Sequence, residues 1–125
     1  MVFAKWVFRL SGIYGILILI PFYFLEDRIG VQTPPAITHP EYYYGFLGVA
    51  LAWQVAFLII SFNPVKYRLF MIPSMAEKFL YSAAVAALFL EGRLPAQMLA
   101  AGAVDFTWVL LFMAAFLKTR VHHER

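Results

Sequence analysis

The sequence predicts an all-α integral membrane protein, folded as a single-domain, up-down four-helix bundle. Three observations predict this class. Of the 125 residues, 63% are hydrophobic and 14% are charged, whereas soluble domains average about 45–50% apolar and about 25% charged. The apolar residues gather in four stretches, each about as long as a membrane span. Turn-forming residues separate these stretches. Composition therefore excludes a water-soluble domain, and a net charge of +3 without a basic stripe predicts no nucleic-acid partner.

The first predicted span covers residues 4–25. Lys5 and Arg9 precede most of its apolar run, so a cleaved signal peptide is the alternative interpretation. The run continues past Pro21 without a small-residue cleavage site, which favours an uncleaved helix. A polar, turn-rich connection, residues 26–39, follows.

The second predicted span covers residues 41–62, and Gln54 interrupts its apolar run. The segment from Thr38 to Glu41 predicts a capping box, in which the threonine accepts an amide of the first turn. Asn63 and Pro64 then end this helix and restart the chain, since Asn accepts orphan amides and proline fits a first turn.

The third predicted span covers residues 66–90 and contains Pro73. A proline inside a helix removes a hydrogen bond and clashes with the carbonyl four residues earlier. Two interpretations follow. Residues 65–72 are either the first turns of a long kinked span, or a short interfacial helix before a span that begins near Pro73.

The fourth predicted span covers residues 95–117, after a tight loop. The basic tail, residues 118–125, is expected to be mobile. Its adjacent His122 and His123 do not face each other on a helix. The sequence therefore predicts no metal site, and the absence of cysteine excludes disulfides and Cys-ligated zinc.

The basic residues are distributed unequally on the two sides of the spans. By the positive-inside rule, this places both termini in the cytoplasm, as expected for a bacterial inner-membrane protein. The short second and third connections predict that helices two, three and four are antiparallel neighbours. Arg28 and Arg93 fall on the outer side, and the residues on the cytoplasmic side are Lys5, Arg9, Lys66, Arg68, Lys118, Arg120 and Arg125.

Two predicted spans carry acidic residues where a bilayer is driest. Glu77 lies about 20 Å, and Asp105 about 15 Å, below the outer ends of their helices. An ionisable residue at such depth is costly unless it is paired or wetted, so it marks a candidate functional site. Four polar residues share one face of the third span at helical spacing; they are Ser74, Glu77, Lys78 and Tyr81.

Gln54 falls at a comparable depth on the second span, and Trp108 lies one turn from Asp105. Two interpretations fit these residues. One is a polar pocket in which a carboxyl group holds a proton or binds a ligand. The other is a structural ion pair that fixes helix register, with Lys78, Arg9 or a tyrosine hydroxyl as the partner. The predicted ligand-binding residues are Glu77, Asp105, Lys78, Tyr81, Gln54 and Trp108, and no catalytic residue is assigned.

An arginine and several glycines within the predicted spans also have expected roles. Arg9 lies one turn inside the first span and is expected to extend its guanidinium to the cytoplasmic head groups. Close helix packing is expected at five glycines: Gly12, Gly15, Gly45, Gly48 and Gly102.

Four segments, residues 39–46, 52–54, 63–68 and 77–78, resemble small uncharacterised bacterial four-helix membrane proteins. In architecture the chain is also similar to DoxX-like proteins and to the four-helix sterol-isomerase and sigma-2 type domain. The latter resemblance implies carboxylates in a buried cavity that binds sterols or amphiphilic amines. It is a resemblance of helix number and acid depth, and no family motif aligns residue by residue.

The sequence thus predicts a small polytopic membrane protein whose buried polar site binds a lipid-like or quinone-like amphiphile. Aromatic residues, 18% of the chain, are typical of such pocket linings. One alternative is an accessory or scaffold subunit of a larger membrane complex, or a homo-oligomer. Another is a membrane-embedded isomerase that uses the buried carboxylates, or a proton-coupled transporter. Membrane lipids are the expected partners, and no cofactor is expected.

Overall fold

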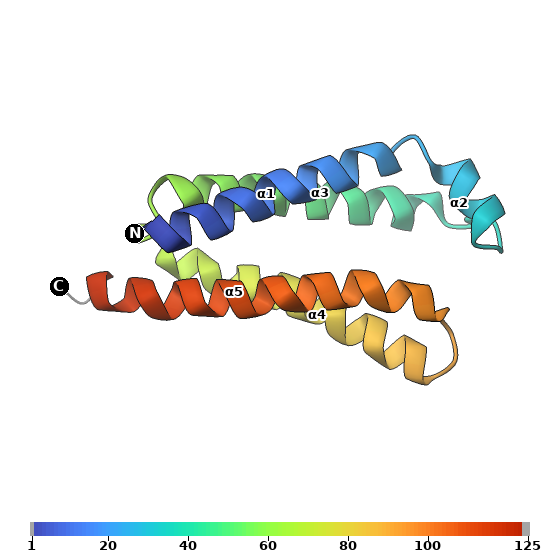
Figure 1. The fold of residues 1–125 in the computed structure, drawn as a ribbon. Helices are drawn as coiled ribbons and strands as arrows, with labels where there is room; N and C mark the ends of the chain where they lie inside the picture. Colours follow the sequence, from blue (N-terminus) through green and yellow to red (C-terminus); the bar gives the residue numbers. More distant parts are fainter. Residues whose placement is uncertain (1, 124–125) are drawn as a thin grey trace.

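A computed structural model describes the backbone of residues 2–123 and the side chains of residues 2–120. This part of the chain is all-α, with five α-helices and two 3-10 turns (Figure 1). In chain order the elements are α1 (Val2–Phe22), α2 (Glu26–Gln32), α3 (Pro40–Phe62), η1 (Arg68–Phe70), α4 (Met71–Leu90), η2 (Ala96–Met98) and α5 (Leu99–His123).

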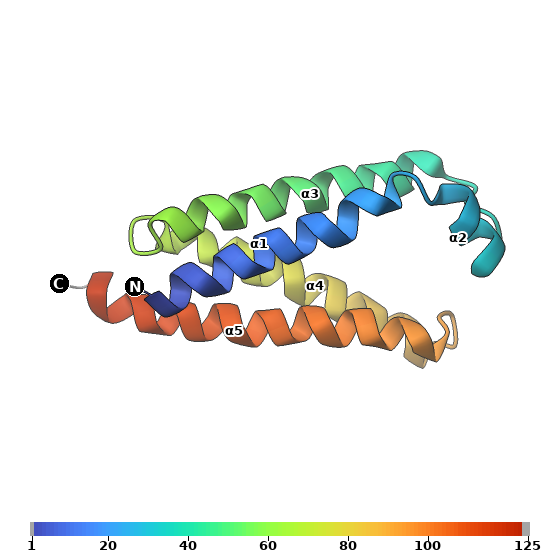
Figure 2. The ribbon, with the colours of Figure 1, turned by 45° about the horizontal axis from the view of Figure 1, so that its top comes forward.

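The long helices form two antiparallel hairpins. α1 packs along α3 and α4 packs along α5, while α1 also contacts α5. Figures 1 and 2 show the hairpins close together where α1 begins and α5 ends, which we call the terminal end, and separated at the opposite, far end. The expected α4–α5 pairing is confirmed. The expected pairing of α3 with α4 is wrong, because these consecutive helices make little direct contact.

The molecule is therefore not strictly a four-helix bundle. Three helical segments of the described chain are long and apolar enough to cross a membrane: Val2–Phe22, Pro40–Phe62 and Ala96–Arg120. α4 is 20 residues long but is not among them, and the adjacent charges of Glu77 and Lys78 lower its hydropathy. The chain is a small polytopic membrane protein with three candidate spans.

The connection expected between residues 26 and 39 contains the short helix α2. The capping-box prediction is also wrong, because His39, not Thr38, precedes the first helical residue of α3 and makes no side-chain cap. Glu41 instead places its carboxylate 3.1 Å from His39 Nδ1. Pro40 occupies the first turn as predicted, where a missing amide hydrogen costs nothing.

The link between α3 and α4 decides between the two interpretations of Pro73. The Lys66 amide donates to Asn63 Oδ1 at 3.2 Å, so Asn63 closes the turn after α3, as predicted. The 3-10 turn η1 follows, and α4 begins at Met71. Pro73 thus lies in the first turn of α4, where amides have no partner within the helix. The helix α4 therefore starts afresh next to Pro73, as in the second interpretation, but a 3-10 turn precedes it instead of an interfacial helix.

An aromatic core joins the two hairpins near the terminal end. Phe8 of α1 stacks on Phe112 of α5, with ring centroids 4.3 Å apart. Phe57 of α3 lies edge-on to both rings, at 6.1 and 5.0 Å. All three side chains are fully buried. The buried cluster around them consists of Ala4, Val7, Phe8, Phe57, Ile60, Met71, Phe112 and Ala115.

The prediction of close packing at glycines is confirmed at three positions. It is wrong at Gly45, where an added Cβ would meet nothing within 4 Å, and at Gly48, where it would meet only the Tyr23 hydroxyl at 3.7 Å. A Cβ added at Gly12 would lie 2.8 Å from the Gln54 carbonyl oxygen, and one at Gly15 would overlap the Gln54 side chain. A Cβ at Gly102 would lie 3.0 Å from Val85 Cγ1. Gly12 and Gly15 bring α1 against α3, and Gly102 brings α5 against α4.

α5 is longer than the predicted fourth span. It continues beyond residue 117 to His123, so the beginning of the predicted tail is helical. Thr119 is fully buried and its hydroxyl donates to the Ala115 carbonyl at 2.9 Å, which ties this turn to the helix. Residues 124–125 and the side chains of His122 and His123 lie outside the described part, so those predictions stay untested.

Candidate intramembrane polar site

An ion pair links α4 to α5 in the middle of the second hairpin. Lys78 Nζ lies 3.6 Å from Asp105 Oδ1, and the two side chains are 6% and 20% exposed. One turn further along α4, the Ser82 hydroxyl lies 3.1 Å from the Lys78 carbonyl oxygen and 3.0 Å from the Gly102 carbonyl oxygen. The close approach at Gly102 makes this second contact possible. Together these contacts set the register of α4 against α5.

The ammonium group of Lys78 is also covered by α3. Its Nζ lies 5.4 Å from the centroid of the Phe57 ring, a cation–π distance. Phe57 belongs to the aromatic core, so the charged pair rests directly on the packed part of the bundle. This contact is one of the places where α3 approaches α4 despite the small interface between them.

Glu77 is half-buried beside this pair and lacks a matching partner. Its Oε2 atom is shielded from solvent and makes no hydrogen bond to any described residue. The carboxylate is within electrostatic range of both Lys78 and Asp105. The cluster thus holds two acids and one ammonium group. It is electrically neutral only when one carboxyl carries a proton or a further cation is present. We call Glu77, Lys78 and Asp105 the charged cluster.

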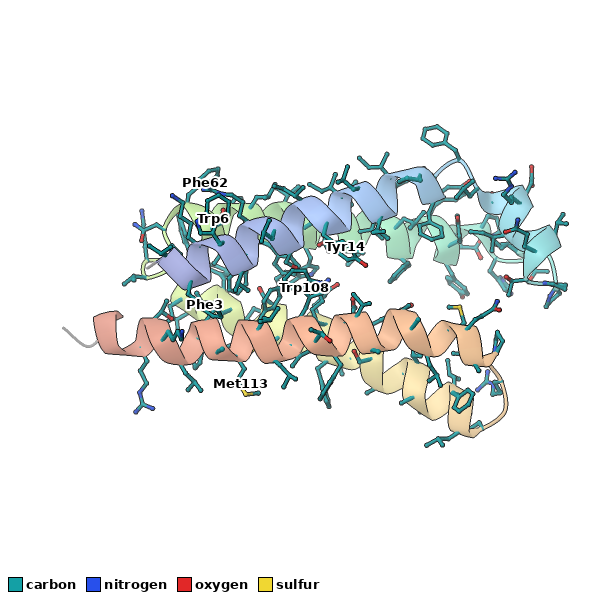
Figure 3. All side chains as sticks on the ribbon, viewed as in Figure 1. Phe3, Trp6, Tyr14, Phe62, Trp108 and Met113 are labelled. Atoms are coloured by element: carbon teal, nitrogen blue, oxygen red, sulfur yellow. The ribbon has the colours of Figure 1, made fainter. Side chains whose placement is uncertain are left out.

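The two predicted aromatic residues of the site, Tyr81 and Trp108, pack in different places. The half-buried Tyr81 stacks on Phe46 of α3 with centroids 6.0 Å apart, and its phenol is within electrostatic range of Asp105. Trp108 lies between Tyr14 of α1 and Phe112 of α5, with both ring centroids 6.1 Å away. Figure 3 shows Tyr14 and Trp108 directed toward one another across the space between α1 and α5.

Gln54 is buried but turned toward α1. Its Nε2 donates to the Ala50 carbonyl at 2.9 Å, and its side chain lies against Gly15. Its Oε1 atom has no hydrogen-bond partner among the described residues, and the same holds for the buried Ser11 hydroxyl on α1. Gln54 therefore belongs to the α1–α3 interface. The structure gives no contact between it and the charged cluster.

Sequence reasoning missed Ser82 and Phe57 as neighbours of the charged cluster. Ser82 lies one helical turn beyond Lys78, so its position on the same face was readable from the spacing. Phe57 reaches Lys78 from another helix, and no local pattern contains that contact.

An apolar groove of about 490 Å³ runs between α4 and α5. Two of its lining residues, Phe79 and Phe106, directly follow Lys78 and Asp105 in the sequence. The remainder of the lining is mostly small, which leaves the space between the helices open. The lining residues are Phe79, Ser82, Ala83, Val85, Ala86, Leu99, Gly102, Ala103 and Phe106.

No protein family, curated protein or solved structure matches this chain. The resemblance to small bacterial four-helix proteins and to sterol-isomerase-type domains therefore remains an expectation from the sequence.

The charged cluster offers hydrogen-bond acceptors and an ammonium donor within one small region. Within residues 2–120, no three metal-ligating side chains converge on one point. Such a set is suited to holding a polar group that both donates and accepts hydrogen bonds, in surroundings of aromatic rings and methyl groups.

Proposed function

We propose that this protein binds a lipid-like or quinone-like amphiphile, with the head group at the charged cluster and the apolar body in the groove between α4 and α5. The observation that carries the proposal is the shielded Glu77 Oε2 atom, which has no hydrogen-bond partner among the side chains and backbone that the structure describes. A buried acceptor left unpaired costs about 1–3 kcal/mol, and more when it is charged. A ligand that donates a hydrogen bond to this oxygen removes that cost.

The apolar groove supports the proposed position of the ligand body. It begins at Phe79 and Phe106, the residues next to Lys78 and Asp105, and its volume of about 490 Å³ falls in the range of ligand pockets, about 300–1,000 Å³. An apolar chain lying there remains at membrane depth while its head group reaches the charged cluster.

The charges define the head group. Glu77 requires a hydrogen-bond donor, whereas the ammonium of Lys78 can donate to an additional oxygen because it carries three N–H bonds. A quinol offers hydroxyl donors, and a quinone or a lipid ester offers carbonyl acceptors. Head groups with both kinds of atom fit this cluster best.

Thermal unfolding of the detergent-solubilised protein tests the proposal. We expect a short-chain ubiquinol, a short-chain ubiquinone or a lysophosphatidylcholine to raise the Tm of the wild-type protein. Glu77→Gln should abolish that rise, because the amide cannot replace a carboxylate acceptor without adding donors that need partners of their own. Glu91→Gln is the matched control, since Glu91 is exposed at the far end.

Two results would contradict the amphiphile proposal. One is an equal rise in Tm for the wild type, Glu77→Gln and Asp105→Asn. The other is the absence of any rise in the wild type with all three compounds.

A second function, as an accessory subunit of a larger membrane complex or a homo-oligomer, is supported by a different observation. α4 is not among the candidate spans, and Asp105 beside it keeps 20% of its side chain exposed. A partner helix against α4 would shield this polar surface from lipid. Purification in native lipid particles tests it. Fixed partner chains or a defined oligomer are expected, and a lone protomer would count against this function.

A further inference from the structure

Charge is distributed unequally between the two ends of the molecule. Six basic residues lie toward the terminal end, and no described acidic residue lies there. The described acids lie toward the far end or in the charged cluster. Under the predicted orientation, the terminal end faces the cytoplasm. The six basic residues are Lys5, Arg9, Lys66, Arg68, Lys118 and Arg120.

Aromatic rings hold several of these cations at the terminal end. The Arg9 guanidinium carbon lies 5.5 Å from the centroid of the Trp6 ring and 5.6 Å from that of Phe62. Lys118 Nζ lies 4.2 Å from the Phe3 ring centroid. In Figure 3, Phe3, Trp6 and Phe62 all lie toward the terminal end. Tryptophan with cationic side chains is typical of the head-group depth of a bilayer.

Arg9 is oriented by its neighbours but keeps most of its donors. Its Nε donates to the Ser61 hydroxyl at 3.4 Å, and that hydroxyl donates to the Leu58 carbonyl. The terminal guanidinium nitrogens make no hydrogen bond or ion pair with any described residue. Their planar arrangement matches the oxygens of a phosphate group.

Arg68, at the same end of the molecule, differs from Arg9 because its side chain is buried and joins two parts of the chain. It is 9% exposed, its Nε donates to the Phe116 carbonyl at 3.1 Å, and its guanidinium lies 3.7 Å from the Phe116 ring centroid. Arg68 thus holds the α3–α4 link against α5. Arg9 has no such role in joining the hairpins.

We propose that Arg9, between Trp6 and Phe62, binds the phosphate of an anionic phospholipid. The phosphate accepts the free guanidinium donors, the two rings lie at the level of the lipid glycerol, and the surrounding cations select a head group with net negative charge. This site shares no residue with the charged cluster, so it stands independently of the proposed amphiphile.

Native mass spectrometry of the full chain in detergent tests the Arg9 site. Dioleoyl phosphatidylglycerol and dioleoyl phosphatidylcholine are added at equal concentrations, and bound lipid is counted. We expect the wild type to retain more phosphatidylglycerol. Arg9→Gln should weaken phosphatidylglycerol binding about fivefold, the contribution of one basic residue near an anionic surface, and leave phosphatidylcholine binding unchanged. Arg93→Gln, at the far end, is the control with the same change of charge and should behave as the wild type.

Three additional measurements complete the experiment. Arg9→Lys keeps the charge without the planar donor set and should give intermediate binding, which provides a readout if Arg9→Gln does not fold. Glycerol phosphate at the lipid concentration should not displace the lipid. Glu77→Gln should keep the full phosphatidylglycerol preference, which separates this site from the proposed function. Unchanged binding in Arg9→Gln and Arg9→Lys, equal loss in Arg93→Gln, or displacement by glycerol phosphate would each overturn the proposal.

Discussion

The two hairpins of this protein are held together by different kinds of contact. In the α1–α3 hairpin, Gly12 and Gly15 let the helix backbones approach, and the uncharged Gln54 side chain fills the space between them. In the α4–α5 hairpin, an ion pair between Lys78 and Asp105 and a shared hydroxyl of Ser82 cross the interface. At its middle the first interface depends on the complementary shapes of the two helices, and a hydrogen bond from Arg9 Nε to the Ser61 hydroxyl lies closer to the terminal end. The middle of the second interface instead contains an ion pair.

The kind of contact in each hairpin corresponds to how apolar its helices are. α1 and α3 are both candidate spans, and α4 is not. A helix with a Glu-Lys pair at its middle gains from a neighbour that supplies a counter-ion, because an unpaired charge in hydrocarbon is expensive. The buried ion pair therefore lies in the hairpin whose helix is least able to face lipid alone.

The largest effect is expected for Lys78→Met. Removing the ammonium leaves Asp105 and Glu77 without their cation, and breaking one side of a buried pair costs roughly 3–5 kcal/mol. The free energy of unfolding, measured by titration with sodium dodecyl sulfate in mixed micelles, should fall by that amount. The double variant Lys78→Met/Asp105→Leu should recover much of the loss, since apolar replacements of buried pairs are often neutral. A single variant as stable as the wild type would show that the second hairpin does not depend on charge.

A smaller loss is expected for Gly15→Val in the first hairpin. The added side chain would overlap Gln54, and forced overpacking typically costs about 1–3 kcal/mol. Gly45→Val is the matched control, because a Cβ at Gly45 meets nothing within 4 Å. The same unfolding titration measures both variants. Equal effects of the two substitutions would contradict the view that shape complementarity holds α1 against α3.

Ser82→Ala should cost about 1 kcal/mol, the usual net contribution of one hydrogen bond. Its hydroxyl lies within hydrogen-bond distance of Gly102 across the interface. Thr107→Ala is the comparison, because the Thr107 hydroxyl is exposed and donates only to Ala103 in its own helix. If both variants lose the same stability, the contact between helices contributes nothing beyond the bond within α4.

The smallest effect is expected at the far end of the second hairpin. Arg93 Nη1 lies 3.3 Å from Glu91 Oε1, but the side chains are 69% and 57% exposed. Exposed pairs of this kind contribute little, so Arg93→Gln should leave the unfolding titration unchanged. A loss close to that of Lys78→Met would mean that charge pairing acts equally at the surface and within the hairpin.

Much of the fold was predictable because long apolar runs have few alternatives in a membrane. The predicted spans 4–25, 41–62 and 95–117 correspond to α1, α3 and α5, although α1 ends at Phe22 and α5 continues to His123. The short α2 was missed because its seven residues carry no helical apolar repeat. The weak contact between α3 and α4 was missed because a short connection limits distance but does not fix the angle at which the next helix leaves.

The sequence predicted which residues form the candidate site, but it did not predict which of the two acids pairs with Lys78. Glu77 and Lys78 are adjacent, so their side chains leave the helix about 100° apart, and the sequence does not say which one faces α5. Lys78 does, and it pairs with Asp105. Gln54 lies at a similar depth but faces α1. This was not predicted, because the depth of a residue in the membrane does not determine the side of the helix on which its side chain lies.

The aromatic core near the terminal end has a mechanical consequence. The two hairpins meet at the rings of Phe8, Phe57 and Phe112. Each hairpin extends from this contact to the far end as a pair of straight helices. Because each hairpin extends about 25 Å beyond the aromatic core, a rotation of one hairpin by one degree about this core displaces its far end by about 0.4 Å. Any change in the angle between the two hairpins would therefore displace their far ends much more than the aromatic core.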